Sequence, residues 1–181
     1  IDYLARSSYL LQQGRDVADM AYFYGEEQPL TALYARAPLN DVPVRHAFDF
    51  VNAEILLKEM SVQEGELVTR GGARYRALYL GGSSRRMTLP VLERLAALVE
   101  SGATVIGEAP ASSPALTDDE SAYAAILKRL WTGEKVASIG RGRVITERAV
   151  EAGLAVAGVR PDFHFQGAPD SSVMFVHRRS D

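Results

Sequence analysis

The 181-residue sequence contains no cysteine. This absence excludes disulfides, thiolate nucleophiles and zinc sites built on cysteine, although it says little about the compartment. An excess of positive charge is also missing, because the formal net charge is -3 and the pI is about 5.7. We therefore expect no nucleic acid and no membrane as partner, since neither has electrostatic support.

Motifs for metal binding, nucleophilic catalysis and nucleotide binding are also absent. The three histidines are scattered, without helical i, i+4 spacing or a nearby carboxylate cluster: His46, His164 and His177. A nucleophilic Ser84 would need one of these distant histidines as its base, and no Gly-x-Ser-x-Gly elbow is present. The sequence also lacks a Walker A pattern and a complete dinucleotide fingerprint. We therefore expect no catalytic residue, no cofactor and no metal site in this segment.

Both ends of the sequence read as cut from a longer protein. The first residue is Ile1 rather than Met. The sequence does not begin with the basic segment and apolar stretch of a signal peptide. Residues 172–181 read as an apolar strand that stops without a closing turn or a partner. We expect further chain on both sides.

The sequence does contain apolar runs that alternate with helical periods. Strands are expected at 17–24, 48–51, 75–80, 103–107, 135–139 and 142–145, and helices at 1–13, 30–37, 53–60, 89–99, 118–131 and 147–152. Solidly apolar strands that alternate with helices are typical of an open, mostly parallel sheet with helices on both faces. We therefore predict an α/β fold with a flavodoxin-like strand order, in which the first strand is central.

Three local signals predict caps and a turn. Asn52 is a favourable N-cap for the helix that follows it. Thr117 with Glu120 has the spacing of a capping box. Glu64 and Gly65 form the expected turn of a hairpin within 61–72.

Polar residues that follow the first two strands are candidate ligand contacts, because ligands of open α/β sheets bind beyond the carboxyl ends of the strands. Glu26 and Glu27 follow the first strand and could serve as acids, bases or acceptors of sugar hydroxyls. A solvated loop is the more frequent arrangement of such charges. Asp49 and Asn52 at the second strand could hold the strand end or contact a ligand, with capping favoured for Asn52.

The third polar strand end is the segment Gly81-Gly-Ser-Ser-Arg-Arg-Met-Thr88. Its glycines allow a sharp turn before hydroxyl and guanidinium groups at a helix N-terminus. Ser84, Arg85 and Arg86 could therefore bind an anion or a polyhydroxyl ligand. Salt bridges from the arginines to a neighbouring domain are an equally good interpretation.

Five segments together carry a resemblance to a known family. Residues 3–14 followed by 17–27 resemble the junction after the catalytic barrel in bacterial glycoside hydrolases of the α-L-rhamnosidase family numbered 106. Phe48-Asp-Phe-Val-Asn52, the segment 79–90 and Phe175-Val-His-Arg178 fit the same family in the same order. The resemblance thus spans nearly the whole chain.

This resemblance implies three parts. Residues 1–14 would be a helix of the preceding barrel domain, 15–160 an accessory domain similar to class I glutamine amidotransferases, and 161–181 the start of a β-rich domain. Amidase chemistry is not expected, because an amidotransferase needs a cysteine nucleophile. The family is implied to hydrolyse α-L-rhamnosides with inversion, using two glutamates and a calcium ion on a barrel that would precede Ile1.

Two hypotheses about function remain. In the first, the segment is a non-catalytic accessory domain of a larger, periplasmic or extracellular glycosidase. It would contact the barrel and β-rich domains of that protein, and its loops are candidates for one rim of the pocket for a rhamnose-containing glycan. In the alternative, it is a freestanding flavodoxin-like or amidotransferase-like module that binds a small ligand or assembles subunits.

Overall fold

A six-stranded sheet forms the centre of the computed structural model, which describes residues 2–27, 41–168 and 173–180. Its strands lie in the order β3 (Phe48–Val51), β2 (Met20–Phe23), β7 (Ala77–Leu80), β8 (Thr104–Ile106), β10 (Gly142–Ile145) and β9 (Val136–Ile139). The first five are parallel and only β9, at the edge, is antiparallel. The predicted open, mostly parallel α/β fold is confirmed, and β2 lies between β3 and β7 as expected. The helix expected at 30–37 lies outside the described residues.

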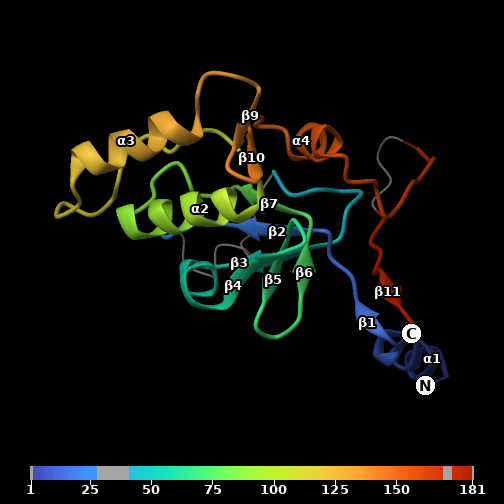
Figure 1. Cartoon of the computed structure of the whole chain (residues 1–181). Helices are drawn as coiled ribbons and strands as arrows, with labels where there is room; N and C mark the ends of the chain where they lie inside the picture. Colours follow the sequence, from blue (N-terminus) through green and yellow to red (C-terminus); the bar gives the residue numbers. More distant parts are fainter. Residues whose placement is uncertain (1, 28–40, 169–172, 181) are drawn as a thin grey trace.

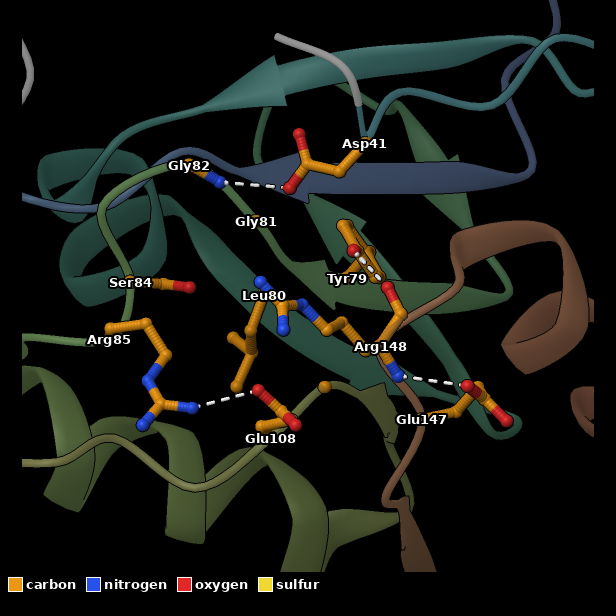
Figure 2. Close-up of a pocket in the computed structure, with 11 residues that line it drawn as sticks. Asp41, Tyr79, Leu80, Gly81, Gly82, Ser84, Arg85, Glu108, Glu147 and Arg148 are labelled. Carbon is orange, nitrogen blue, oxygen red and sulfur yellow. Dashed lines mark hydrogen bonds and ion pairs between the residues drawn. The ribbon is translucent and has the colours of Figure 1, made fainter.

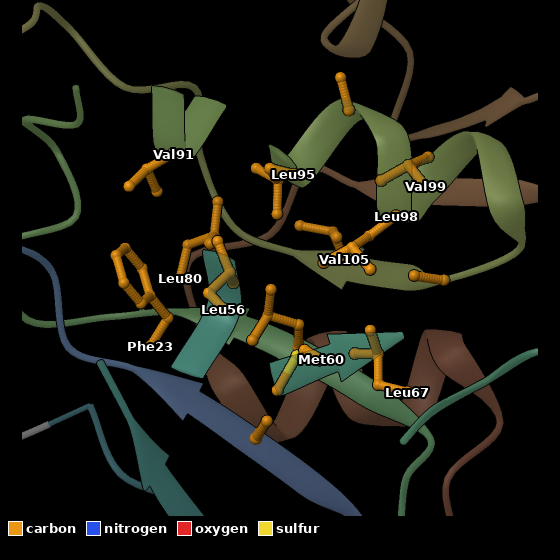
Figure 3. Close-up of a cluster of buried hydrophobic side chains, with 14 of the residues drawn as sticks. Phe23, Leu56, Met60, Leu67, Leu80, Val91, Leu95, Leu98, Val99 and Val105 are labelled. Carbon is orange, nitrogen blue, oxygen red and sulfur yellow. The ribbon is translucent and has the colours of Figure 1, made fainter. Parts of the chain in front are cut away.

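Helices cover both faces of this sheet because side chains alternate along each buried strand. Ala21 and Phe23 of β2 face a core formed with α2 (Leu89–Ser101) and α3 (Glu120–Leu130). Met20 and Tyr22 face the opposite core, formed with α4 (Val150–Ala157). Figure 3 shows the first core, where strand side chains meet those of α2. Burial of each leucine there stabilises the fold by about 1.5–3 kcal/mol.

The second core is rich in aromatic rings. The ring of Tyr22 lies 5.2 Å from that of Phe50 in an edge-to-face arrangement and 5.4 Å from that of Tyr79. Phe48 also packs edge to face on Phe50 at 5.2 Å. Such pairs add about 0.5–1.5 kcal/mol beyond their buried area. The position of the Tyr22 ring is therefore closely fixed.

A small antiparallel sheet follows β3, formed by β4 (Met60–Gln63), β5 (Glu66–Thr69) and β6 (Arg74–Tyr75). The expected hairpin is confirmed. Its turn residues Glu64 and Gly65 both have positive φ, 54° and 83°, which suits the right-handed twist of paired strands.

The α-helix expected at 53–60 is wrong in type and length. Ile55–Glu59 forms a π-helix, and Met60 already begins strand β4. Arg94 of α2 donates hydrogen bonds to the carbonyl oxygens of Leu56 and Met60. A distant guanidinium thus satisfies backbone acceptors at this irregular turn, which local periodicity does not reveal.

The capping box expected at Thr117 and Glu120 is also wrong. The N-cap of α3 is Asp119, whose carboxylate accepts the N–H of Ala122 at 2.9 Å. Aspartate is as good an N-cap as serine or threonine, so the start of the helix moves by two residues.

The last helix begins later than the expected range of 147–152. The carboxylate of Glu147 accepts the N–H groups of Arg148 at 3.0 Å and Ala149 at 3.2 Å. These bonds hold an irregular turn after β10, and α4 starts only at Val150.

The first helix and the last strand lie away from the central sheet (Figure 1). Helix α1 (Asp2–Gln12) forms as expected, with no buried residue, and β1 (Arg15–Asp16) pairs antiparallel with β11 (Arg178–Arg179). The apolar strand expected at 172–181 is wrong for most of its described part, because Phe175 instead stacks on Phe163 at 5.1 Å. Among the described residues, no helix has the length and apolar character needed to cross a membrane. The domain boundaries after residues 14 and 160 stay predictions.

Candidate functional site

A polar pocket of about 360 Å³ lies where β7, β8 and β10 end (Figure 2). Its walls include Leu80 and Gly81 at the end of β7, Glu108 after β8, and Glu147 with Arg148 after β10. These are carboxyl ends of parallel strands, the edge at which open α/β sheets bind ligands. The pocket is therefore the candidate functional site.

Close packing at the end of β7 explains the glycine at position 81. A Cβ atom on Gly81 would lie 2.2 Å from the hydroxyl oxygen of Tyr22, far inside van der Waals contact. Because the Tyr22 ring is buried among other aromatic rings, it has no room to move aside. Glycine thus lets the backbone just after β7 approach the Tyr22 side chain closely and turn into the pocket wall.

Asp41 joins the pocket to the central strand. Its Oδ1 accepts the hydroxyl of Tyr22 at 2.6 Å, and its Oδ2 accepts the N–H of Gly82 at 3.2 Å. Burial, followed by the hydrogen bond to Asp41, raises the pKa of Tyr22 well above its ordinary value. The phenol of Tyr22 therefore stays protonated and acts as the donor. The carboxylate of Asp41 has two fixed partners, a side chain of β2 and a backbone N–H just after β7.

The two arginines of the pocket differ in their partners. Arg85 pairs with Glu108 at 2.7 Å across the exposed rim. For the Arg148 guanidinium, the described part of the chain provides no hydrogen bond or ion pair. Its backbone carbonyl accepts the hydroxyl of Tyr79 at 2.8 Å, which fixes the main chain. Figure 2 shows the Arg148 side chain extending across the pocket toward Leu80.

Ser84 is a largely buried residue of the pocket lining. Only 6% of the residue is exposed, and its N–H donates to the carbonyl of Gly81 in the turn after β7 at 3.0 Å. Within the described ranges, its Oγ has no hydrogen-bond partner. Because this hydroxyl belongs to a residue of the pocket lining, it has capacity to bind a ligand.

The carboxylates of Glu26 and Glu27 bind groups within this domain and do not line the pocket. Glu26 accepts both the N–H of Thr88 at 2.7 Å and its hydroxyl at 2.8 Å, at the N-terminus of α2. Glu27 pairs with Arg86 at 2.7 Å on the surface. These contacts give both glutamates and Arg86 structural partners, and a binding role for them stays a prediction.

Asp49 and Asn52 also lie outside the pocket lining. The Asp49 carboxylate accepts the hydroxyl of Tyr75 at 3.0 Å. Asn52 accepts the N–H of Ile55 at 2.9 Å, so the predicted capping bond is present. Of the seven candidate ligand residues, the structure thus brings only Ser84 and Arg85 into this pocket.

Sequence reasoning missed most of the charged pocket residues. Glu108 and Glu147 lie two residues after the ends of β8 and β10, so the rule applied to the earlier strand ends would have found them. Asp41 follows no strand and has no such signal. The lining holds acceptors, hydroxyls and guanidinium groups but no histidine, and the described residues contain no group of three or more metal-binding side chains. This chemistry suits binding of hydroxyl-bearing and anionic ligands.

An open, mostly parallel sheet with helices on both faces places the chain in the class of open α/β domains, and its polar pocket lies at the carboxyl edge of that sheet. The chain belongs to glycoside hydrolase family 106, described as alpha-L-rhamnosidase, whose family model matches residues 1–181. The resemblance seen in the sequence is thereby confirmed for the family, whereas the likeness to amidotransferases stays a prediction.

Two known proteins are similar to the chain over nearly its whole length. The solved structure of a rhamnosidase from Novosphingobium sp. PP1Y superposes with a TM-score of 0.93 at 49% sequence identity, covering 99% of this chain and 17% of that one. A protein of Formosa agariphila, named provisionally as a beta-glucuronidase, is 31% identical over 186 residues. That alignment covers 100% of this chain and 15% of the relative. The chain therefore spans only a small part of the proteins it matches.

Proposed function

We propose that this chain is a non-catalytic accessory domain of a larger glycoside hydrolase that cleaves α-L-rhamnosides. The observation that carries the proposal is its close match to only 17% of a rhamnosidase, at 49% identity. A shared segment of that size supports a part of an enzyme rather than the enzyme itself. The two catalytic glutamates and the calcium ion implied by the family resemblance would then belong to the barrel. The described residues offer no group of metal ligands for that ion.

The simplest test compares the full-length protein with residues 1–181 alone. We expect the full-length protein to hydrolyse an aryl α-L-rhamnoside, and the segment alone to show no activity above buffer. Equal rates per mole would overturn the proposal. A purified segment that is folded by circular dichroism but inactive would support it.

In this proposal helix α1 packs on the preceding barrel and connects it to the accessory domain. The apolar residues of this helix are between 50% and 79% exposed: Tyr3, Leu4, Tyr9, Leu10 and Leu11. An exposed apolar helix face is typical of a surface that another domain covers. The family resemblance supports the barrel as that domain.

A charge on this face would test the contact in the full-length protein. Leu10→Glu should lower both the thermal stability and the rhamnosidase activity, because a buried carboxylate without a partner is costly. Gln12→Glu adds the same side chain and the same charge on the opposite side of this exposed helix and serves as the matched control. If both variants behave like the unmodified protein, the barrel does not rest on this face.

The pocket rim is a second part of the proposal. Ser84 and Arg85 line the pocket, whereas Arg86 beside them is paired with Glu27 and does not. We expect Arg85→Gln to raise KM for a rhamnoside substrate more than Arg86→Gln does. An unchanged KM in both variants would remove the rim role and leave the supporting role in place.

A further inference from the structure

Two side chains of the pocket have hydrogen-bonding capacity that the rest of the described chain does not use. The hydroxyl of Ser84 is in a residue that is 6% exposed, and the guanidinium of Arg148 extends across the pocket (Figure 2). The Ser84 hydroxyl can both donate and accept, and the guanidinium offers up to five donors in a planar fork. A ligand with a hydroxyl and a hydrogen-bond acceptor satisfies both, and the bond to the guanidinium is strongest when the acceptor carries negative charge.

The acidic side chains of the pocket all have hydrogen-bond or ion-pair partners within the described chain. Glu108 pairs with Arg85 at 2.7 Å, and Asp41 accepts hydrogen bonds from Tyr22 and Gly82. Glu147 accepts two backbone N–H groups and pairs with a lysine at 3.3 Å. Among the described lining residues, the positive charge of Arg148 thus has no ionic partner, whereas the negative charge of Asp41 is hydrogen-bonded only to neutral donors and can accept a further hydrogen bond.

The volume of the pocket suits a single sugar ring. It measures about 360 Å³, near the lower end of the roughly 300–1,000 Å³ found for small-molecule sites. The side chains of Leu80 and Tyr79 supply apolar wall between the polar groups. A carbohydrate ring, with its apolar C–H face and polar rim, matches such a lining.

We propose that this pocket binds an anionic monosaccharide unit, with Arg148 on the anionic group and Ser84 and Asp41 on the sugar hydroxyls. A carboxylate or a phosphate accepts two parallel N–H bonds from a guanidinium, the geometry that favours arginine over lysine. The carboxylate of Asp41 keeps lone pairs beyond those used by Tyr22 and Gly82, so it can accept a sugar hydroxyl. A uronic acid and a sugar phosphate share this chemistry.

Isothermal titration calorimetry on the full-length protein distinguishes these sources. The four probes are D-glucuronate, D-glucose 6-phosphate, neutral D-glucose and inorganic phosphate. We expect one of the two sugar anions to bind at least about tenfold more tightly than glucose and inorganic phosphate, because charge-assisted hydrogen bonds are the strong ones. If glucose bound as tightly as the sugar anions, the pocket would not require a negative charge. If inorganic phosphate bound as tightly, the pocket would not recognise the sugar. Either result overturns the proposal, as does the absence of binding by both sugar anions.

Two variants assign the binding to this pocket. Arg148→Gln keeps the backbone contacts of residue 148 and should weaken sugar-anion binding about tenfold or more. The exposed Arg160, beyond the far end of α4, gives the matched control Arg160→Gln, which should bind normally. Ser84→Ala should weaken binding about three- to tenfold and decides the matter if the Arg148 variant is unstable. Unchanged affinity in a folded Arg148→Gln variant overturns the proposal. If that variant is unstable, unchanged affinity in Ser84→Ala overturns it. Binding is measured without turnover, so its result is independent of whether the protein cleaves rhamnosides.

Discussion

The hydroxyl of Tyr22 donates a 2.6 Å hydrogen bond to Oδ1 of Asp41, which joins the central strand to the pocket wall. Tyr22 is fully buried, and the other oxygen of the same carboxylate accepts the N–H of Gly82. A single carboxylate therefore connects the end of β7 to a side chain of β2. The shape of the pocket depends on this connection.

Asp41→Ala should lower the free energy of unfolding by about 1–3 kcal/mol, because it leaves the buried hydroxyl of Tyr22 without a partner. Tyr22→Phe should cost less, about 1 kcal/mol, since Asp41 keeps the N–H of Gly82. Urea unfolding of the chain measures both. The exposed Tyr9→Phe serves as the control and should be neutral. If the double variant loses the full sum of the two single losses, the two groups are not coupled.

Gly81→Ala should destabilise the fold by about 1–3 kcal/mol, because its Cβ would overlap the buried ring of Tyr22. Gly71→Ala is the matched control, since its Cβ would meet no atom nearer than 3.9 Å. Thermal unfolding should show a lower Tm for the first variant, by about 2–4 °C per kcal/mol. A Tm for Gly81→Ala equal to that of Gly71→Ala would mean that the ring can move.

Glu26→Ala should lower stability by about 1–2 kcal/mol, because two hydrogen bonds at the N-terminus of α2 disappear. Glu27→Ala removes an exposed ion pair with Arg86 and should cost at most about 1 kcal/mol. Hydrogen exchange of the first turn of α2, at Leu89 and beyond, localises the effect. Faster exchange there in the Glu27 variant than in the Glu26 variant would contradict the assignment.

Stability should decrease with rising pH through the titration of Asp19. Burial, and after it the negative charge of Asp162, raise the pKa of Asp19 above 3.8. Interactions with Arg76, His177 and His46 lower this pKa but do not outweigh the two raising effects. The folded protein therefore holds this proton more tightly than the unfolded chain, so stability is lost between 3.8 and the raised pKa. Relative to the unmodified chain, Asp19→Asn should gain stability as the pH rises through that window. A constant difference in urea unfolding across this window would disprove the effect.

Glu151 should give the opposite pH dependence. Burial opposes its ionisation, but hydrogen bonds from the N–H groups of Val44 at 2.9 Å and Arg45 at 3.0 Å, with the charges of His46 and Arg45, lower its pKa. Its contribution is present above 4.5 and is lost as the pH falls through the lowered pKa. Glu151→Gln should therefore be most destabilising near neutral pH and least so in acid. The same urea series measures this, and a loss that grows in acid would be the wrong sign.

Local sequence predicted the elements that depend on side-chain periodicity or on the backbone preferences of single residues. The apolar runs that contain β2 and β7, the helix from Leu89, and the turn at Glu64 and Gly65 follow from side-chain periodicity and backbone preference. The π-helix at 55–59 was missed because its partner, Arg94, is more than thirty residues away. Asp119 was missed because Thr117 offered an equally plausible cap nearby.

The sequence by itself determined the strand and helix segments, the absence of cysteine chemistry and the likeness to a rhamnosidase family. Each of these depends on neighbouring residues or on a run of matched segments. Only the tertiary structure decided which polar side chains meet, because Asp41, Ser84, Glu108 and Arg148 come from four separate segments. It assigned Glu26 to a helix end rather than to the pocket, since the end of β2 lies beside the start of α2. Contacts across such distances along the chain form only when the sheet brings its strand ends together.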